Sequence, residues 1–238
     1  MNKFLNPFRF FLVALWTVVC AIIAFILIII AFRKEMASVV ARVIWAPVIL
    51  FICGVKLVIT GKENLPRTSA IYISNHESLL DIPAIFAAIP HNLFFIAKKE
   101  LKKVPFMGWA MQMGGMIFID RKNKEQAKKD MFRAGELIKK GKNIISFPEG
   151  TRTKTSEVGI FKRGTFILSV NTGIDIIPIS IENARELLPS GSFHLKGGEI
   201  QIRISPAVSP KNHSADEVEK FASDVRKIVE KNLINLKE

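Results

Sequence analysis

The longest run of hydrophobic residues lies near the N-terminus, from Phe10 to Phe32. It carries no charge, and Thr17 is its only clearly polar residue. A helix of this length matches the hydrocarbon core of a bilayer, which is about 30 Å thick. The run is longer than the core of a signal peptide, and no small-residue cleavage site follows it before Arg33. We therefore predict a membrane-associated helix, with a signal peptide or a buried core helix as the alternatives.

A second hydrophobic run extends from Val43 to Val55 and includes Pro47. It is too short to span a bilayer, so we predict an interfacial or re-entrant helix. We expect residues 1–56 to form a membrane-anchoring segment of two helices. Similar numbers of cations precede and follow the first run, so the positive-inside rule does not fix its orientation. The side chains suited to the headgroup region are Arg33, Lys34, Arg42, Lys56, Trp16 and Trp45.

Beyond residue 56 the pattern changes to short apolar runs separated by amphipathic segments. The runs typical of strands are residues 57–60, 70–74, 93–97, 116–120, 143–147, 176–180 and 199–204. Residues 123–140 carry apolar side chains at helical spacing, and Ser214 with Glu217 forms a capping box before a C-terminal amphipathic helix. This alternation predicts an α/β domain over residues 57–238, with a mostly parallel or mixed sheet flanked by helices.

Composition and charge narrow the class of protein. The 34 Lys and Arg residues outnumber the 21 Asp and Glu residues, which gives a net charge of +13, while 49% of the residues are hydrophobic. High charge combined with high hydrophobicity excludes a disordered chain. Cys20 and Cys53 lie in the apolar runs, and neither has the spaced partners of a disulfide framework or a zinc site. We therefore expect no metal, and a reduced cytosolic setting fits best.

The segment SNHESLLD, residues 74–81, carries the first candidate chemistry because it directly follows a predicted strand. A neutral imidazole at His76 can accept a proton from a hydroxyl, and a carboxylate such as Asp81 can fix its tautomer and stabilise the imidazolium. Loops at the carboxyl ends of strands are where α/β folds place such groups. The alternative is local structure: Ser78 with Asp81 fits a capping pattern, and Asp81 before Pro83 fits a helix N-cap.

The segment FPEGTRT, residues 147–153, follows another predicted strand. Pro148 ends the strand and Gly150 permits a tight turn, so that Glu149, Thr151 and Arg152 project from the strand's carboxyl end. A guanidinium holds a phosphate with two hydrogen bonds, and a Thr hydroxyl can add a third. The alternative is an ordinary polar turn with a Glu–Arg pair.

The segment MGGMIFIDR, residues 113–121, places two glycines before a strand and Asp120 with Arg121 after it. The glycines match neither a dinucleotide fingerprint nor a Walker A motif, so nucleotide binding has no support. Asp120 as the cap of a following helix is the simpler alternative. The remaining histidines have no carboxylate or His partner at useful spacing and are expected at the surface or in loops: His91, His194 and His213.

Taken together, these blocks resemble the lysophosphatidic acid acyltransferase family, the 1-acyl-sn-glycerol-3-phosphate O-acyltransferases. Four blocks match the family in order and spacing: NHESLLD (75–81), GGMIFIDR (114–121), FPEGTRT (147–153) and IIPIS (176–180). The segments AKKEL (97–101) and FKRGTF (161–166) also look familial. The resemblance covers residues 57–180, and the apolar N-terminus is in keeping with it.

The resemblance implies a mechanism. His76, oriented by Asp81, would act as general base on the sn-2 hydroxyl of lysophosphatidic acid, which would attack the thioester of acyl-CoA or acyl-acyl-carrier-protein and give phosphatidic acid. No covalent acyl-enzyme, metal or cofactor is implied, because a thioester is already activated. The acceptor phosphate would be received by Arg121 and Arg152 in a turn shaped by Glu149, Gly150 and Thr151, with Lys98 and Lys162 as weaker phosphate candidates.

Other interpretations stay open on the sequence alone. The same His–Asp chemistry would also acylate glycerol 3-phosphate or another lysolipid. The sequence predicts neither which acyl chain is preferred nor whether the thioester donor is acyl-CoA or acyl-acyl-carrier-protein. A non-catalytic protein that binds anionic membranes would need neither His76 nor Asp81. A nucleic-acid partner is disfavoured because the basic chain lacks an aromatic-basic surface motif. We expect membrane lipids as partners and a location at the cytoplasmic face of the cell inner membrane.

Overall fold

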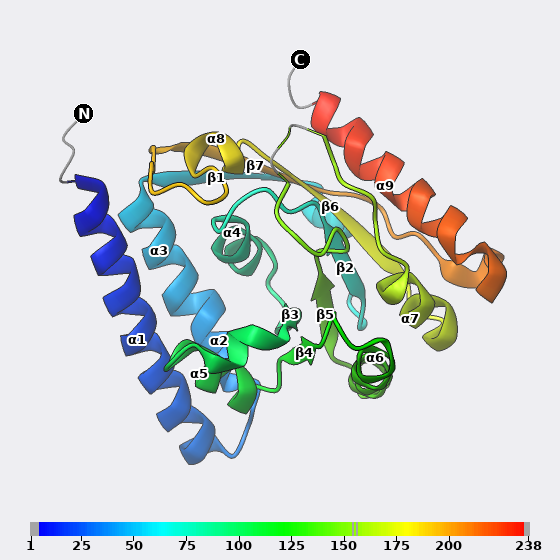
Figure 1. Ribbon diagram of the computed structural model, residues 1–238, viewed down its shortest axis with the longest axis horizontal. Helices are drawn as coiled ribbons and strands as arrows, with labels where there is room; N and C mark the ends of the chain where they lie inside the picture. The colour runs from blue at the N-terminus through cyan, green and yellow to red at the C-terminus, as the bar shows by residue number, and fades with distance from the viewer. Residues whose placement is uncertain (1–4, 154, 156, 236–238) are drawn as a thin grey trace.

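A seven-stranded sheet with the order β1-β7-β6-β2-β5-β3-β4 forms the centre of the computed structural model, which describes residues 5–153, 155 and 157–235 (Figure 1). Neighbouring strands are parallel, except that β6 and β7 are antiparallel. The predicted mixed α/β sheet is therefore confirmed. The strands are β1 (Val55–Thr60), β2 (Ile71–Ser74), β3 (Leu93–Lys98), β4 (Ile117–Ile119), β5 (Asn143–Ser146), β6 (Ile176–Glu182) and β7 (Gly198–Ile204).

Helices cover both faces of the sheet. The helices are α1 (Leu5–Ala31), α2 (Met36–Val40), α3 (Ala46–Cys53), α4 (Asp81–Ala88), α5 (Met107–Met113), α6 (Lys124–Lys139), α7 (Gly164–Thr172), α8 (Ala184–Leu187) and α9 (Val218–Asn235). A π-helical segment occupies Ala41–Trp45, and 3₁₀ turns lie at Lys62–Asn64, Lys99–Lys103, Pro210–Asn212 and Ala215–Glu217.

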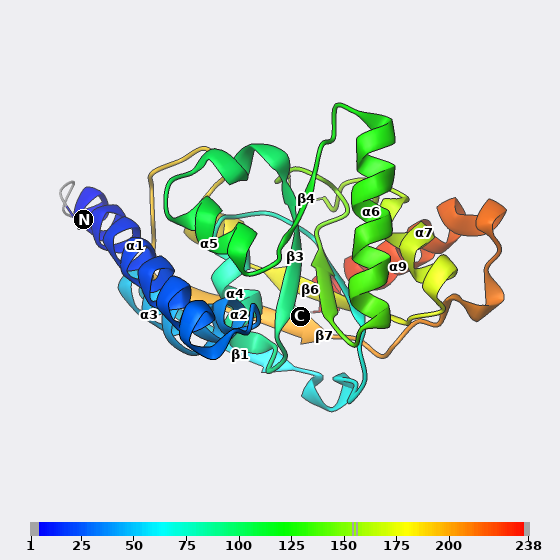
Figure 2. The ribbon, with the colours of Figure 1, turned by 90° about the horizontal axis from the view of Figure 1, so that it is seen from below.

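The two faces have separate hydrophobic cores. Alternate residues of a strand point to opposite faces, and in β2 the side chains of Ile71 and Ile73 join α6, α7 and α9. Tyr72, between them, joins α3 and α4 on the other face. Figure 2 shows the N-terminal helices on one side of the strands and α6, α7 and α9 on the other. The loops at the carboxyl ends of the strands therefore lie between the helices that pack on one face of the sheet and those that pack on the other.

The second N-terminal helix is longer than predicted. The chain is helical from Met36 to Cys53, through α2, the π-helical segment and α3, so the predicted start at Val43 is wrong. Pro47 does not end this helix: the wider π-helical turn directly before it accommodates a residue that lacks an amide hydrogen and crowds the preceding turn. With this length, the helix, like α1, is long and apolar enough to cross a membrane.

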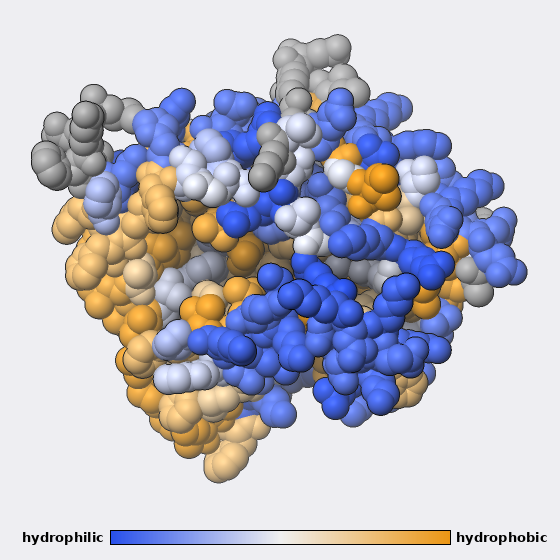
Figure 3. All heavy atoms as spheres, in the orientation of Figure 1, coloured by the Kyte–Doolittle hydropathy of each residue, from blue (hydrophilic) through white to orange (hydrophobic). Residues whose placement is uncertain are grey.

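The helix α1 packs on this second helix and leaves its other face open. Cys20 and Ala24 are buried against the second helix, and the indole of Trp45 donates a hydrogen bond to the Thr17 hydroxyl at 3.0 Å. On the opposite face, large apolar side chains such as Ile30 are exposed. Figure 3 shows this apolar surface over α1, in contrast to the hydrophilic surface on the α9 side. An uncovered apolar face of this size is typical of contact with a membrane or a partner.

Candidate active site

Two predicted motifs meet at the carboxyl edge of the sheet. Residues 75–80 follow β2, and residues 147–163 follow β5. Because β2 and β5 are parallel neighbours, the loops that follow them emerge at the same edge. The loops touch directly, since the amide of Thr153 donates a hydrogen bond to the carbonyl of His76 at 2.9 Å.

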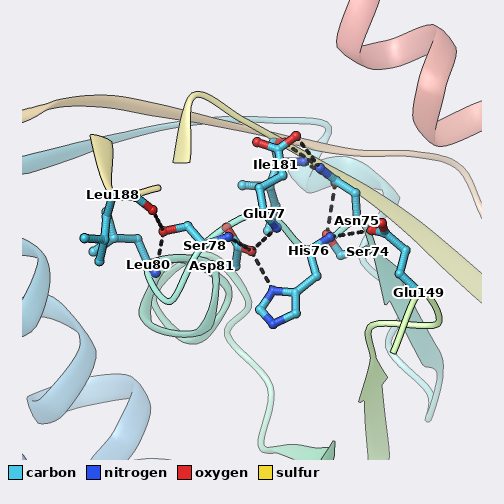
Figure 4. Close-up of polar contacts among 10 residues, drawn as sticks. All are labelled: Ser74, Asn75, His76, Glu77, Ser78, Leu80, Asp81, Glu149, Ile181 and Leu188. Atoms are coloured by element: carbon cyan, nitrogen blue, oxygen red, sulfur yellow. Dashed lines mark hydrogen bonds and ion pairs between the residues drawn. The ribbon is translucent and has the colours of Figure 1, made fainter. Parts of the chain in front are cut away.

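The imidazole of His76 is paired with the carboxylate of Asp81. Their Nδ1 and Oδ2 atoms lie 2.7 Å apart (Figure 4). The same Oδ2 accepts hydrogen bonds from the amides of Glu77 at 2.7 Å and Ser78 at 2.9 Å. Asp81 is fully buried, whereas the His76 side chain is 15% exposed. With Nδ1 committed to a fixed carboxylate, Nε2 is the ring nitrogen available to a ligand.

The capping alternative for this segment holds in part, because Asp81 accepts from the Ser78 amide and the Ser78 hydroxyl accepts from the Leu80 amide at 3.2 Å. Asp81 is not the N-cap itself: it is the first residue of α4, and the N-cap position is Leu80, without a side-chain cap. The Ser78 hydroxyl also donates to the carbonyl of Leu188 at 2.8 Å. Asp81 therefore directs its carboxylate back to the loop and His76, so the two candidate residues are brought together as the sequence predicted.

Two residues that the sequence analysis did not single out hold His76 in place. The ring of Phe147 stacks on the His76 ring, with centroids 4.1 Å apart and planes at 17°. Asn75 ties the loop to β6, because its side chain donates to the Ile181 carbonyl at 2.8 Å and accepts from the Ile181 amide at 2.9 Å. Asn75 and Phe147 both belong to the predicted motifs, but the sequence carries no signal for their contacts, which depend on the fold.

Glu149 joins the two loops from within. Its carboxylate accepts from the His76 amide at 2.7 Å and from the Gly159 amide at 2.9 Å. The side chain is buried, and burial raises the pKa of Glu149 above its ordinary value. Its oxygens are thus occupied by backbone donors, and Glu149 shapes the turn rather than facing outward.

Cationic side chains gather around the turn at Gly150. This glycine has a φ of +76°, a left-handed conformation that suits a residue without a side chain. The Arg121 guanidinium donates a hydrogen bond to the Gly150 carbonyl, and the Lys162 ammonium lies against Gly150. Arg152 is half-buried two residues further along. Two predicted phosphate candidates from separate segments, Arg121 and Lys162, therefore meet at the turn that carries Arg152.

Two of the predicted phosphate candidates are exposed, and only one of them lies at this turn. Lys98 is exposed at the end of β3 and lies 3.7 Å from the Glu100 carboxylate. Thr151 is exposed at the turn itself. Asp120 pairs with Lys99 at 2.9 Å, while Asn123, rather than Asp120, provides the side-chain cap of α6. In the described part of the chain, no group of three or more His, Cys, Asp or Glu side chains is arranged to hold a metal ion.

Glu77 is a buried carboxylate that the sequence analysis left unassigned. Burial, together with the negative charge of Asp81, raises the pKa of Glu77 to about 7. The Asn75 side-chain amide donates to it at 3.4 Å, and the charge and backbone amide of Arg185 act in the opposite direction on its pKa. The floor of the site is therefore acidic, in contrast to the cationic turn.

Comparison with known proteins agrees with this arrangement. A family model described as Acyltransferase matches residues 56–182, which is more than half of the chain. Residues 56–182 therefore form an acyltransferase domain, and this range includes His76, Asp81, Arg121 and the turn at Gly150.

The comparisons narrow the family further. The chain is 33% identical over 232 residues to the 1-acyl-sn-glycerol-3-phosphate acyltransferase of Saccharomyces cerevisiae, which covers 95% of this chain and 77% of that protein. It is 34% identical over 183 residues to the chloroplastic enzyme of this name from Arabidopsis thaliana, covering 76% of this chain and 51% of that protein. The crystal structure of the 1-acyl-sn-glycerophosphate (LPA) acyltransferase from Thermotoga maritima matches with a TM-score of 0.84 and 28% identity over 99% of this chain and 96% of that one. The chain belongs to the 1-acyl-sn-glycerol-3-phosphate acyltransferase family, as the sequence motifs predicted.

Proposed function

We propose that the protein transfers an acyl group from a thioester donor, acyl-CoA or acyl-acyl-carrier-protein, to the sn-2 hydroxyl of lysophosphatidic acid. The observation that carries this proposal is the 2.7 Å contact of His76 with buried Asp81, one loop away from a cationic turn. A general base and a phosphate site at this proximity suit an acceptor that carries both a hydroxyl and a phosphate. The family membership supports the same conclusion.

In the proposed reaction, Nε2 of His76 removes the proton of the acceptor hydroxyl as the oxygen attacks the thioester carbonyl. The new C–O bond forms while the carbonyl oxygen becomes negatively charged. Collapse of this intermediate breaks the C–S bond and releases the thiolate, which receives the proton from the imidazolium. Asp81 stabilises the imidazolium, because its carboxylate is fixed at Nδ1. No metal or cofactor takes part in this scheme, and the acyl donor is a co-substrate.

The cationic turn would bind the acceptor phosphate. Arg152 and Arg121 are the main candidates, and Thr151 can add a hydroxyl. Gly150 and Glu149 act on the shape of the turn, because Glu149 is occupied by two backbone amides. Lys162 lies closer to the turn than Lys98 does, and this makes Lys162 the better of the two additional candidates.

The test is a panel of acceptors and donors. Purified protein is assayed with lysophosphatidic acid, glycerol 3-phosphate and a neutral lysolipid, each with acyl-CoA and with acyl-acyl-carrier-protein. The proposal expects the highest kcat/KM with lysophosphatidic acid. A preference for glycerol 3-phosphate or for the neutral lysolipid would redirect the acceptor assignment. Transfer from no donor to any acceptor would sink the proposed activity and favour a membrane-binding protein without catalysis.

We also propose that residues 1–56 anchor the domain of residues 57–238 to the cytoplasmic face of the inner membrane. The exposed apolar face of α1 and the length of the second helix support this. The test uses cysteine labelling, because Cys20 and Cys53 are both buried. Lys128→Cys, at an exposed position of α6, should react with a membrane-impermeant maleimide in inverted inner-membrane vesicles. Reaction in intact spheroplasts instead would place the domain on the other side.

A further inference from the structure

A pocket of about 390 Å³ opens on the side of the site that faces away from the N-terminal helices. One wall is the loop that precedes α7, with Ile160, Phe161, Lys162 and Arg163, and the other is the first part of α9, with Glu219 and Arg226. Figure 1 shows α1 and α9 on opposite flanks of the molecule, and Figure 3 shows that the α9 flank is hydrophilic. The pocket is therefore reached from water rather than from the apolar face of α1.

The pocket combines positive charge with an apolar surface. Arg226 is held rigidly, because its Nε and Nη2 atoms donate to the Val158 carbonyl at 3.1 and 2.8 Å. Arg163, in contrast, is 69% exposed and lies 3.7 Å from Glu219, its ion-pair partner. Ile160 is 81% exposed at the rim, whereas Phe161 is buried. Three cations line the pocket with apolar side chains, against the carboxylates of Glu219 and of Glu230, which pairs with Arg226 at 2.6 Å. This combination suits a ligand with an aromatic ring and phosphate groups.

The pocket wall is continuous with the candidate active site. The Lys162 amide donates to the Pro148 carbonyl at 3.0 Å, and its ammonium lies against Gly150. Glu149 binds the amide of Gly159 in this loop and the amide of His76 in the other. The pocket and the candidate active site therefore share the loop between β5 and α7.

We propose that this pocket binds the phosphorylated adenosine end of an acyl-CoA donor. The adenine ring lies on the apolar side chains, the phosphates face Arg163, and the pantetheine arm carries the thioester toward His76. This inference rests on the proposed acyl transfer from a thioester. It also divides the two substrates in space, because the lipid acceptor arrives from the side of α1 and the soluble end of the donor from the side of α9.

The experiment compares two donors that share one thioester, acyl-CoA and S-acyl-pantetheine, on the full-length protein. Arg163→Glu reverses an exposed charge and should raise the KM for acyl-CoA about 5- to 10-fold. The KM for S-acyl-pantetheine should stay within about 2-fold, because this donor lacks the nucleotide. Glu219→Gln removes the lining carboxylate and should lower the KM for acyl-CoA. The matched control is Arg133→Glu, which changes an arginine on α6 that is 77% exposed and lies 3.9 Å from its own carboxylate partner.

The outcomes separate this inference from the activity on which it rests. An equal rise in KM for both donors overturns the pocket assignment, and so does a rise confined to acyl-acyl-carrier-protein. Binding of adenosine 3′,5′-bisphosphate, measured by calorimetry, needs no turnover. The inference expects wild-type binding that weakens in Arg163→Glu and not in Arg133→Glu. Absence of binding to the wild-type protein overturns it, even where acyl transfer is observed.

Discussion

The two loops of the site are held in opposite ways. In the loop after β2, Asn75, Ser78 and Asp81 are buried, and each bonds to the backbone. In the turn after β5, Thr151 is exposed and Arg152 is half-buried. A general base must have its orientation set before the substrate arrives, since misplacement lowers the rate steeply. A phosphate-binding arginine benefits from being accessible, because the phosphate then replaces water around the guanidinium and no buried hydrogen bond within the protein has to break.

This comparison predicts that the two loops respond differently to mutation. Changes in the loop after β2 should act mainly on kcat, and changes in the turn after β5 mainly on the KM of the acceptor. Glu149 belongs to both, because it accepts from the amides of His76 and Gly159. Replacement of Glu149 would therefore disturb both loops and would not separate an effect on kcat from an effect on KM. Residues that belong to one loop alone give the sharper tests.

The largest effect is expected for His76→Ala. Loss of general-base catalysis should lower kcat about 10²–10⁴-fold. The fold should persist, because His76 lies in a loop and Asp81 keeps the amides of Glu77 and Ser78 as donors. The measurements are kcat with lysophosphatidic acid and the melting curve followed by circular dichroism. Turnover within a few-fold of the wild type would remove His76 from the mechanism.

Asp81→Asn should have the next largest effect. The amide oxygen would keep the position of Oδ2, because the amides of Glu77 and Ser78 donate there, but a neutral amide no longer stabilises the imidazolium that forms. We expect kcat to fall roughly 10²-fold or more, with little change in the acceptor KM. The variant also tests the structural alternative, since Asp81 begins α4. A lowered Tm with normal turnover would show that the carboxylate serves only the local structure.

Arg152→Ala tests the open turn. Removal of a charged phosphate contact should raise the KM for lysophosphatidic acid roughly 10-fold or more, while the donor KM changes less. Arg152→Lys should restore binding only in part, because an ammonium does not reproduce a two-pronged contact. Lys98→Ala is the comparison, since Lys98 is exposed and near Glu100, and its effect should be smaller. Equal damage to both substrate constants would indicate a structural role for Arg152.

The sequence predicted the strands and the proximity of His76 to Asp81, because both depend on local patterns. Each predicted apolar run of four to six residues became a strand, and the motifs followed the strands directly. The helix over 124–139 was predicted from its apolar spacing. The helix that contains Pro47 was predicted too short, because the π-helical turn that accommodates the proline depends on packing between helices.

Other features were beyond reach of the sequence because they join distant residues. Asn75 contacts Ile181, and the stacking of Phe147 on His76 needs two strands to be neighbours. The spacing of NHESLLD predicted a His–Asp pair, yet it gave no sign that Glu149 would bind the His76 amide from another loop. Motif order along the chain identified the family, while strand order in the sheet brought the loops of the candidate site together.

The smallest expected effect on kcat concerns Glu77, which is buried within the loop after β2 but does not contact the His76 ring in the described hydrogen bonds. Its pKa is raised to about 7, mainly by burial, from an ordinary value of 4.5. The folded protein therefore binds more protons than the unfolded chain between these two values. The contribution of Glu77 to the free energy of unfolding then falls as the pH rises through this window. Above about pH 7 the carboxylate is charged in both states, and the full cost of burying its charge lowers the stability of the folded protein. Gln cannot ionise and keeps an oxygen that accepts from the Asn75 side chain.

Glu77→Gln should therefore stabilise the protein at pH 8 by about 1–3 kcal/mol, which corresponds to a few degrees in Tm, and the difference should vanish near pH 4.5. The measurement is the Tm of both proteins in the same detergent across this pH range. kcat should change much less than in Asp81→Asn, because Glu77 does not contact the His76 ring among the described hydrogen bonds. A Tm difference that is the same at both pH values would show that ionisation of Glu77 has no part in the stability of this loop.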